Sequence, residues 1–269
     1  MSTSQDVFGK YIKLVVSQAT DPQIREMAQN GGAVTALLVY ALKTGIIDGA
    51  IISTRNTERP FYPIPMLTTI AAEIIQNAGS RYTYSANLKA LSDASKRNMR
   101  AVAFVGTPCQ IRIVREMQQK QDARVACVRL LIGLMCPRTY DYQKLMIDHI
   151  QNTLGVNLHD IQKIDIKGQM IITSKTGQKT LPLKDLEEYS RKPCLECQDF
   201  SSEQADISSG SLGLYDSTFT IIRTTLGEEL FSQAEQAHAV TTRAVLKDEP
   251  ALRLLLKLSK QKHTRPGNA

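Results

Sequence analysis

The residues best suited to chemistry lie together in residues 191–213. Cys194 and Cys197 form a Cys-x-x-Cys pair, so both thiolates can reach one metal centre. A hydroxyl-rich run, Ser-Ser-Gly-Ser at 208–211, follows and offers side-chain and backbone donors to an anion. This stretch therefore predicts metal ligands next to a candidate anion-binding loop.

Three more cysteines decide whether the pair belongs to a larger site, because a four-cysteine site needs thiolates from at least two chain segments. Cys109 follows one apolar strand at a turn, and Cys136 ends the next strand. The ends of neighbouring strands in an α/β sheet meet at one edge, so these two could face the pair. Cys127 lies inside an apolar segment and is interpreted as core. The alternative is that Cys109 and Cys136 are buried hydrophobic residues, and the spacing alone does not separate iron–sulfur from zinc.

An alternative interpretation of Cys109 is that it is a nucleophile rather than a metal ligand. Pro108 opens a predicted helix, so Cys109 lies at a helix N-terminus, where a thiol pKa is lowered. Nucleophilic cysteines usually need a histidine base. The histidines are all distant in sequence, which does not exclude contact in the fold: His149, His159, His238 and His263.

Several polar segments could bind an anion, and each has a plainer explanation. Gly31-Gly32 precedes a predicted helix and could hold a phosphate on free amides, or simply form a tight turn. The segment 79–82, Gly-Ser-Arg-Tyr, offers hydroxyls, a guanidinium and a ring, or is an exposed loop. Four lysines mark one basic hairpin, which is otherwise a solvated face: Lys163, Lys167, Lys175 and Lys179.

The composition narrows the class of protein. The chain has 269 residues, 42% of them hydrophobic, a net charge of +7 and a pI of about 9.1, which suits acidic partners. Aromatic content of 6% is too low for a platform that stacks single-stranded nucleic acid. No apolar run has transmembrane length, and the N-terminus lacks the features of a signal peptide. We expect a cytoplasmic protein whose cysteines are thiols or ligands.

Strand and helix signals alternate through the first half of the chain and predict a largely parallel α/β sheet. Predicted strands cover 11–16, 46–53, 101–106 and 125–133, and predicted helices cover 20–29, 33–45, 67–77, 88–97, 108–119 and 141–154, with 55–65 as a loop. Alternating segments at 161–167, 170–174 and 179–183 are broken by Gly168 and Gly177 and predict β-hairpins. Further on, we expect a short helix at 186–190, a strand at 218–223, a helix at 227–234, a strand at 239–245 and a last helix from Pro250.

Taken together, the segments resemble the beta-subunit family of coenzyme F420 hydrogenases and dehydrogenases. The matching pieces run in order from about residue 10 to 235. They include residues 31–38, 47–50, 79–82, Gly-Thr-Pro-Cys-Gln at 106–110, 132–136, Asp-Ile-Lys-Gly at 165–168, Cys-Leu-Glu-Cys-Gln-Asp-Phe at 194–200, 205–208 and 223–231. Thr-Pro-Cys-Gln together with Cys-x-x-Cys-x-Asp-Phe is a specific combination. Ser209 departs from the family pattern, where an aliphatic residue is expected.

The resemblance implies a mixed α/β sheet flanked by helices, with a β-hairpin insertion and with iron–sulfur and flavin sites at one edge. It implies an N-terminal α/β part of the flavin-binding unit at 1–85, a part carrying the cluster cysteines at 86–248, and a helix and tail at 249–269. It also implies FAD, one 4Fe–4S cluster, and coenzyme F420 as the substrate of hydride transfer, with hydrogenase large and small subunits as partners. No side chain is expected to act as an acid, base or nucleophile.

The resemblance also assigns residues to these cofactors. The expected cluster ligands are Cys109, Cys136, Cys194 and Cys197. The expected flavin-site and coenzyme-site residues are Gly31, Gly32, Val34, Thr35, Ser80, Arg81, Tyr82, Gly106, Thr107, Lys167, Ser208, Gly210, Ser211 and Gly213. Other classes stay open, namely a zinc-stabilised nucleic-acid-binding protein, a non-enzymatic assembly subunit, or a subunit of a formate dehydrogenase or disulfide reductase.

Overall fold

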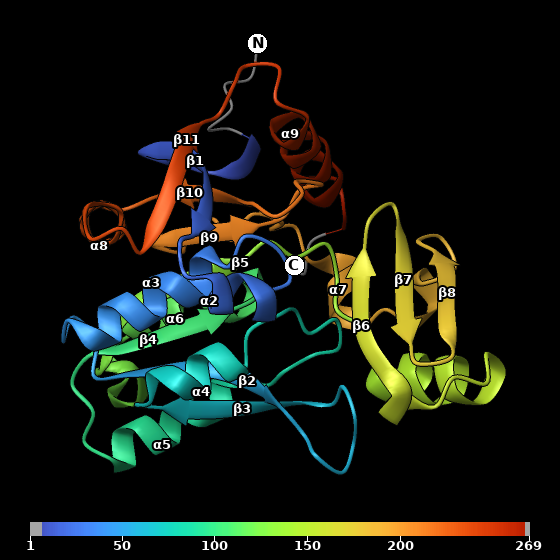
Figure 1. Cartoon of the computed structure of the whole chain (residues 1–269). Helices are drawn as coiled ribbons and strands as arrows, with labels where there is room; N and C mark the ends of the chain where they lie inside the picture. The colour runs from blue at the N-terminus through green and yellow to red at the C-terminus, as the bar shows by residue number, and fades with distance from the viewer. Residues whose placement is uncertain (1–6, 267–269) are drawn as a thin grey trace.

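A computed structural model describes residues 7–266 (Figure 1). Residues 1–6 and 267–269 lie outside it, so part of the N-terminal stretch used for the signal-peptide expectation and the end of the predicted tail have no structural account. A large mixed sheet with helices on both sides forms the main body, and a small three-stranded sheet stands beside it (Figure 1). In the described residues, no helix is long and apolar enough to cross a membrane.

The main sheet has the strand order β11-β1-β10-β9-β5-β4-β2-β3. Its strands are β1 (Lys13–Ala19), β2 (Gly49–Arg55), β3 (Pro63–Thr68), β4 (Val102–Gly106), β5 (Val128–Leu134), β9 (Ile207–Gly210), β10 (Thr218–Ile222) and β11 (Val240–Ala244). The neighbours β2, β4, β5 and β9 are parallel, and the outer pairings are antiparallel. The expected mixed α/β sheet is therefore present.

The helices begin where the sequence supplies caps. The side chain of Asp21 accepts a hydrogen bond from the amide of Gln23, and Thr107 and Gln110 form a capping box. The helices are α2 (Pro22–Met27), α3 (Ala33–Lys43), α4 (Ala71–Gln76), α5 (Leu91–Lys96), α6 (Pro108–Gln119), α7 (Lys192–Glu196), α8 (Thr225–Gln236) and α9 (Pro250–His263). Short 3-10 turns are η1 (Asn87–Ala90), η2 (Ala123–Val125), η4 (Leu158–Asp160) and η5 (Glu187–Tyr189), and η3 (Gln143–Thr153) is a π-helix.

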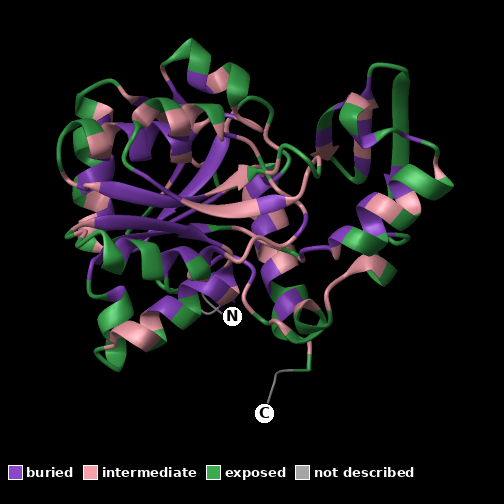
Figure 2. Ribbon diagram, turned by 90° about the horizontal axis from the view of Figure 1, so that it is seen from below, coloured by how far each residue is buried: buried purple, intermediate pink, exposed green. Residues whose placement is uncertain are grey.

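The central strands are buried on both faces because their apolar residues alternate between two cores (Figure 2). In β2, Ala50 and Ile52 pack towards α3 and α8, whereas Ile51 packs towards α5 and α6. α9 covers the neighbouring part of this second face, through Ala251 and Leu255. Because both faces of these strands are buried, successive residues are apolar and the sequence of each strand is a continuous apolar run.

The predicted hairpins form a separate antiparallel sheet, β6 (Ile161–Ile166), β7 (Gln169–Ser174) and β8 (Gly177–Pro182). Met170 and Ile172 of β7 are fully buried in a core shared with η3. Gly168 and Gly177 have positive φ angles, as the hairpin prediction required. This small sheet has its own apolar core beside the main sheet.

Two predictions about the main sheet are wrong. Residues 55–65 were expected as a loop and 67–77 as a helix, but β3 pairs with β2 and the helix starts only at Ala71. β3 is an edge strand, where its prolines are tolerated. The run 208–211 was expected as a loop, but Ser208 and Ser209 are buried in β9, between β5 and β10. Composition suggested a turn there, whereas small side chains fit a crowded central strand.

Strand direction brings the polar segments to one edge. β10 is antiparallel to both β9 and β1, so β1 points the same way as β9, β5, β4 and β2. Arg55 is the last residue of β2, and the segments that follow the other strands carry the Gly31-Gly32 turn, Cys109, Cys136 and residues 211–213. Ligands of open α/β sheets bind at the carboxyl ends of the strands. The direction of the strands therefore brings the candidate residues to the same edge of the sheet.

Asp206 holds this sheet to two helices. The residue is 3% exposed, and its carboxylate accepts hydrogen bonds from the amide of Leu131 and from the side chains of Arg115 and Thr224, each at 2.8 Å. Asp206→Ala would leave these donors unpaired. We expect it to lower the free energy of unfolding by about 3 kcal/mol, measured by urea denaturation.

The matched control for this variant is Asp248→Ala, which removes an exposed carboxylate from the turn before α9. Its unfolding midpoint should stay at the wild-type value. Equal midpoints for the two variants would contradict the structural role of Asp206.

Candidate functional site

Four cysteines from three segments meet at the edge of the main sheet. Cys109 lies in the first turn of α6, Cys136 follows β5, Cys194 lies in α7 and Cys197 ends that helix. The pKa of the Cys136 thiol is raised to about 12, mainly by burial and also by the charges of Cys194, Cys109 and Cys197, while the charge of Lys262 acts in the opposite direction. The three other thiols are therefore all within electrostatic reach of Cys136.

Local hydrogen bonds orient these thiols. The hydroxyl of Thr107 lies 3.2 Å from Cys109 Sγ, and the amide and hydroxyl of Thr139 lie 3.5 and 3.4 Å from Cys194 Sγ. The backbone amide of Cys136 donates to the carbonyl of Phe200 at 2.9 Å, which ties two of the segments together. In residues 7–266 no histidine hydrogen-bonds to Cys109, so the arrangement lacks the base that a nucleophilic cysteine uses.

The spacing of the sulfurs discriminates between kinds of centre. Among residues 7–266, no group of three or more His, Cys, Asp or Glu side chains is close enough to hold a single metal ion. A tetrahedral zinc site needs four ligands about 2.3 Å from one atom. In a four-cysteine 4Fe–4S site each thiolate binds a different iron, so the sulfurs stand further apart. The four thiols lie near one another, but in residues 7–266 they do not form a set that would hold a single metal ion.

Cys127 is separate from this group. It is 8% exposed and packs in the core beneath α5 and α6, and burial raises the pKa of its thiol. It lies just before β5 rather than inside it.

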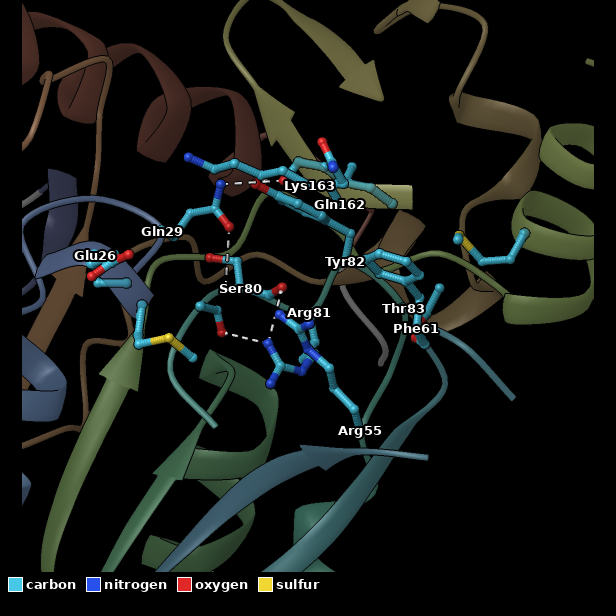
Figure 3. A pocket seen from close by; sticks show the side chains of 15 residues that line it. Glu26, Gln29, Arg55, Phe61, Ser80, Arg81, Tyr82, Thr83, Gln162 and Lys163 are labelled. Atoms are coloured by element: carbon cyan, nitrogen blue, oxygen red, sulfur yellow. Dashed lines mark hydrogen bonds between the residues drawn. The ribbon is translucent and has the colours of Figure 1, made fainter. Parts of the chain in front are cut away.

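A cavity of about 260 Å³ opens between the main body and the small sheet (Figure 3). Its main-body wall comes from the end of α2, from Arg55 and Phe61, and from residues 79–83, and its other wall comes from Met146 and β6. Its lining residues are Glu26, Met27, Ala28, Gln29, Arg55, Phe61, Gly79, Ser80, Arg81, Tyr82, Thr83, Met146, Gln162, Lys163 and Ile164. Aromatic rings beside guanidinium and ammonium groups suit an anionic ligand that has a flat ring.

Arg81 is the most constrained cation of the cavity. Its guanidinium donates to the carbonyls of Gly79 at 2.9 Å and Asn77 at 3.1 Å, while Nε is buried and has no partner among the described residues. The pKa of Arg81 is lowered to about 10, mainly by burial and also by the nearby positive charge of Arg55. The two side chains point towards each other in Figure 3. Two adjacent guanidinium groups with an unpaired donor favour an anion.

Gln29 joins the two walls. Its side-chain amide donates to the carbonyl of Ile164 at 3.2 Å and to the carboxylate of Asp165, and its oxygen accepts from the amide of Ser80 at 3.3 Å (Figure 3). Beside it, burial and the charge of Asp165 raise the pKa of Tyr82 well above its usual range. The Tyr82 phenol is therefore protonated at neutral pH.

A short ladder connects the cavity to the cysteines. The amide of Tyr140 donates to the carbonyl of Tyr82 at 3.0 Å, and Tyr140 also pairs with Ser190. The preceding residue, Thr139, contacts Cys194. Since adjacent strands lie about 4.8 Å apart, the three segments span roughly 10 Å. The cavity and the thiols thus belong to one continuous site.

The predicted ligand-binding residues divide into three groups. Ser80, Arg81 and Tyr82 line the cavity. Gly31 packs against Ser217, which a Cβ would approach to 2.7 Å, and the Lys167 ammonium lies 5.1 Å from the ring centroid of Tyr215 in the same loop. Gly31 and Lys167 thus form a second group, which lies along the boundary of the two sheets next to the cavity. Val34, Thr35, Ser211 and Gly213 lie on the neighbouring segments.

The third group of predicted residues is packed inside the protein. A Cβ on Gly106 would meet the ring of Phe104 at 2.6 Å. Ser208 donates to the carbonyl of Ser202 and accepts from Arg223, so its hydroxyl is already used. Gly210 packs against the side chain of Met135. These residues pack at the edge of the sheet. Of the predicted residues in this part of the described structure, Thr107 is the one whose side chain contacts a cysteine.

Sequence reasoning missed Gln29, Arg55 and Phe61. Gln29 was included only as the end of a helix, and Arg55 only as the start of a proline-rich loop. Nothing in the local sequence relates them to residues 79–83, because their proximity arises from the pairing of β2 with β3 and from the placement of β6.

Comparison with known proteins gives consistent matches over nearly the whole chain. The family described as coenzyme F420 hydrogenase/dehydrogenase, beta subunit, matches with its N-terminal part at residues 14–92 and its C-terminal part at residues 99–248. The coenzyme F420 hydrogenase subunit beta of Methanothermobacter thermautotrophicus is 36% identical over 95% of this chain and 92% of its own length. That of Methanococcus voltae is 34% identical, over 95% and 92%.

A solved structure agrees with these matches. A chain of the F420-reducing [NiFe] hydrogenase complex from Methanosarcina barkeri superposes with a TM-score of 0.92 at 31% identity, covering 98% of this chain and 93% of that chain.

Gln29→Ala removes the bridge between the cavity walls. We expect faster hydrogen exchange in residues 161–166 and 79–83, because both segments lose their hydrogen bonds with the Gln29 side chain. Mass spectrometry of deuterated peptides measures this. Gln23→Ala, an exposed glutamine on α2, serves as the control and should leave both peptides unchanged. Unaltered exchange in Gln29→Ala would show that the bridge does not hold the walls.

Proposed function

Because the chain belongs to the coenzyme F420 hydrogenase/dehydrogenase beta-subunit family, we propose that it is an iron–sulfur flavoprotein subunit that transfers hydride and electrons between coenzyme F420 and a partner hydrogenase. The observation that carries this proposal is the ladder from Tyr82 through Tyr140 to Cys194, which sets a basic, ring-lined cavity beside four gathered thiols.

The four thiols fit a 4Fe–4S cluster. Cys109, Cys136, Cys194 and Cys197 would supply one thiolate each, and Thr107 and Thr139 would donate hydrogen bonds to two of the sulfurs. When bound, FAD exchanges a hydride with the deazaflavin, and the cluster carries the electrons singly.

The cavity and the boundary next to it fit a flavin and an anionic coenzyme. Arg81 and Arg55 would bind phosphate or carboxylate groups, and Phe61 and Tyr82 would lie against a ring. A cavity of 260 Å³ holds part of such a ligand, so the remainder would follow the boundary towards Lys167. The protonated Tyr82 can donate a hydrogen bond but cannot serve as a base, in line with an expectation of no side-chain acid or base.

The family relationship favours hydrogenase large and small subunits as partners, since the relatives matched over most of their length are hydrogenase beta subunits. Formate dehydrogenase and disulfide reductase subunits are the other classes to test, by purification of the complex from its source. The overall reaction is tested by mixing anaerobically prepared protein with reduced coenzyme F420 and a viologen dye. Dye reduction supports the proposal, and a colourless protein free of iron and flavin contradicts it.

Cys136→Ala should abolish the iron–sulfur centre, because the central thiol of the group is lost. We expect iron and sulfide contents near zero and no cluster absorption. Cys127→Ala is the matched control and should keep wild-type iron, since Cys127 belongs to the core. Full iron content in Cys136→Ala would remove this residue from the ligand set.

Arg81→Ala should weaken flavin retention or raise the apparent KM for coenzyme F420 by about tenfold, the loss expected when one charge-assisted contact of about 1.4 kcal/mol is removed. Flavin absorbance after gel filtration and steady-state kinetics measure the two effects. Lys167→Ala tests the boundary in the same way. Arg97→Ala, an exposed arginine on the far side of α5, controls for the loss of a positive charge. Wild-type values for Arg81→Ala would remove it from the site.

A further inference from the structure

Arg265 connects two of the segments that carry cysteines, although it lies two residues after α9 and beyond the residues that the family model matches. Its Nη1 atom donates a hydrogen bond to the carbonyl of Cys194 at 2.7 Å and another to the carbonyl of Pro137 at 3.2 Å. Pro137 directly follows Cys136. One guanidinium group therefore joins α7 to the segment after β5.

α7 depends on contacts of this kind because it has little packing of its own. The helix has five residues, Lys192–Glu196, and none of them is buried. The carbonyls at the end of a helix have no partner within the helix, and a cation at that end is favourable. The carbonyl of Cys194 belongs to this last turn. Arg265 thus supplies both a donor and a positive charge where α7 ends.

Two further contacts fix the end of α9 to the chain that follows Cys197. The side chain of Gln198 donates to the carbonyl of Arg265 at 2.8 Å, and Nε2 of His263 lies 3.1 Å from a carboxylate oxygen of Glu203. The other end of α9 is held by its apolar residues, which share a core with Phe200 and the main sheet. The position of Arg265 is therefore set by α9 and does not depend on α7.

We propose that Arg265 is a positioning residue of the cysteine site, which clasps α7 to the segment after β5 and so keeps Cys194 and Cys197 beside Cys136. Cys109 does not need this clasp, because α6 is fixed by its capping box and by the core. Ligands that are held in place before binding retain a metal centre better. The order of α7 concerns the chain alone, whereas the consequence for iron rests on the proposed function.

The first test is the rate of iron release from the anaerobically prepared full chain to a ferrous chelator. Arg265→Ala should release iron about tenfold faster than the wild type, the effect of losing one charge-assisted hydrogen bond. Its midpoint of urea denaturation should stay at the wild-type value, because the apolar contacts of α9 remain. Arg265→Lys keeps the charge but not the planar fork, so its rate should lie between the two.

The second test is hydrogen exchange of the full chain after the iron has been removed. Peptides that cover residues 192–198 should exchange about tenfold faster in Arg265→Ala than in the wild type, while peptides of β1 and β10 should be unchanged. Arg253→Ala is the matched control, because Arg253 is an exposed arginine of α9 whose side chain makes no hydrogen bond within residues 7–266. It should match the wild type in both tests.

Equal rates for Arg265→Ala and Arg253→Ala in both tests would overturn the proposal. Faster iron release together with a lower urea midpoint and faster exchange in β1 and β10 would also overturn it, since the whole fold would then be weakened. Wild-type protein without iron would contradict the proposed function instead, and the exchange of residues 192–198 would then decide on the clasp by itself.

Discussion

The architecture depends on bringing four thiol groups, which start far apart in sequence, to the carboxyl edge of one sheet. The parallel strands β4 and β5 bring two of these thiols together, because the strands end side by side and each is followed by a cysteine. The remaining pair arrives on α7, whose position is fixed by the backbone contact of Arg191 with Thr139 and by the contact of Phe200 with Cys136. Every other part of the site is placed relative to this meeting point.

Much of this arrangement was accessible from the sequence. The apolar runs predicted the buried strands, and Pro108 predicted the start of the helix that carries Cys109. Gly168 and Gly177 predicted the turns of the small sheet. The separation of Cys127 from the other cysteines also followed from its apolar neighbours. These inferences were correct because each depends on local chemistry or on the general direction of parallel strands.

The predictions that were wrong have a different physical cause. β9 has the composition of a loop, but Arg223 uses Ser208 and Ser201 as hydrogen-bond partners, and small residues leave room for its buried side chain. Ser209, where the resemblance led us to expect an aliphatic residue, is buried with an unpaired hydroxyl in the described structure. In such a strand the side chains are selected by long-range neighbours, which sequence patterns do not reveal. For the same reason, sequence patterns did not identify Gln29, Arg55 and Phe61.

The small sheet explains how one fold can combine two kinds of site. The cysteines need a rigid setting, and they receive it from the double-sided core of the main sheet. A ligand that enters and leaves needs a wall that can yield. Near the cavity β6 is joined to the main body by the hydrogen bonds of Gln29 and by Phe61, Tyr62 and Tyr82, which are only partly buried against the core of the small sheet. Elements with few apolar contacts open at lower free energy than core strands. The division into a fixed thiol centre and a separately packed cavity wall therefore follows from where the chain placed its hydrophobic residues.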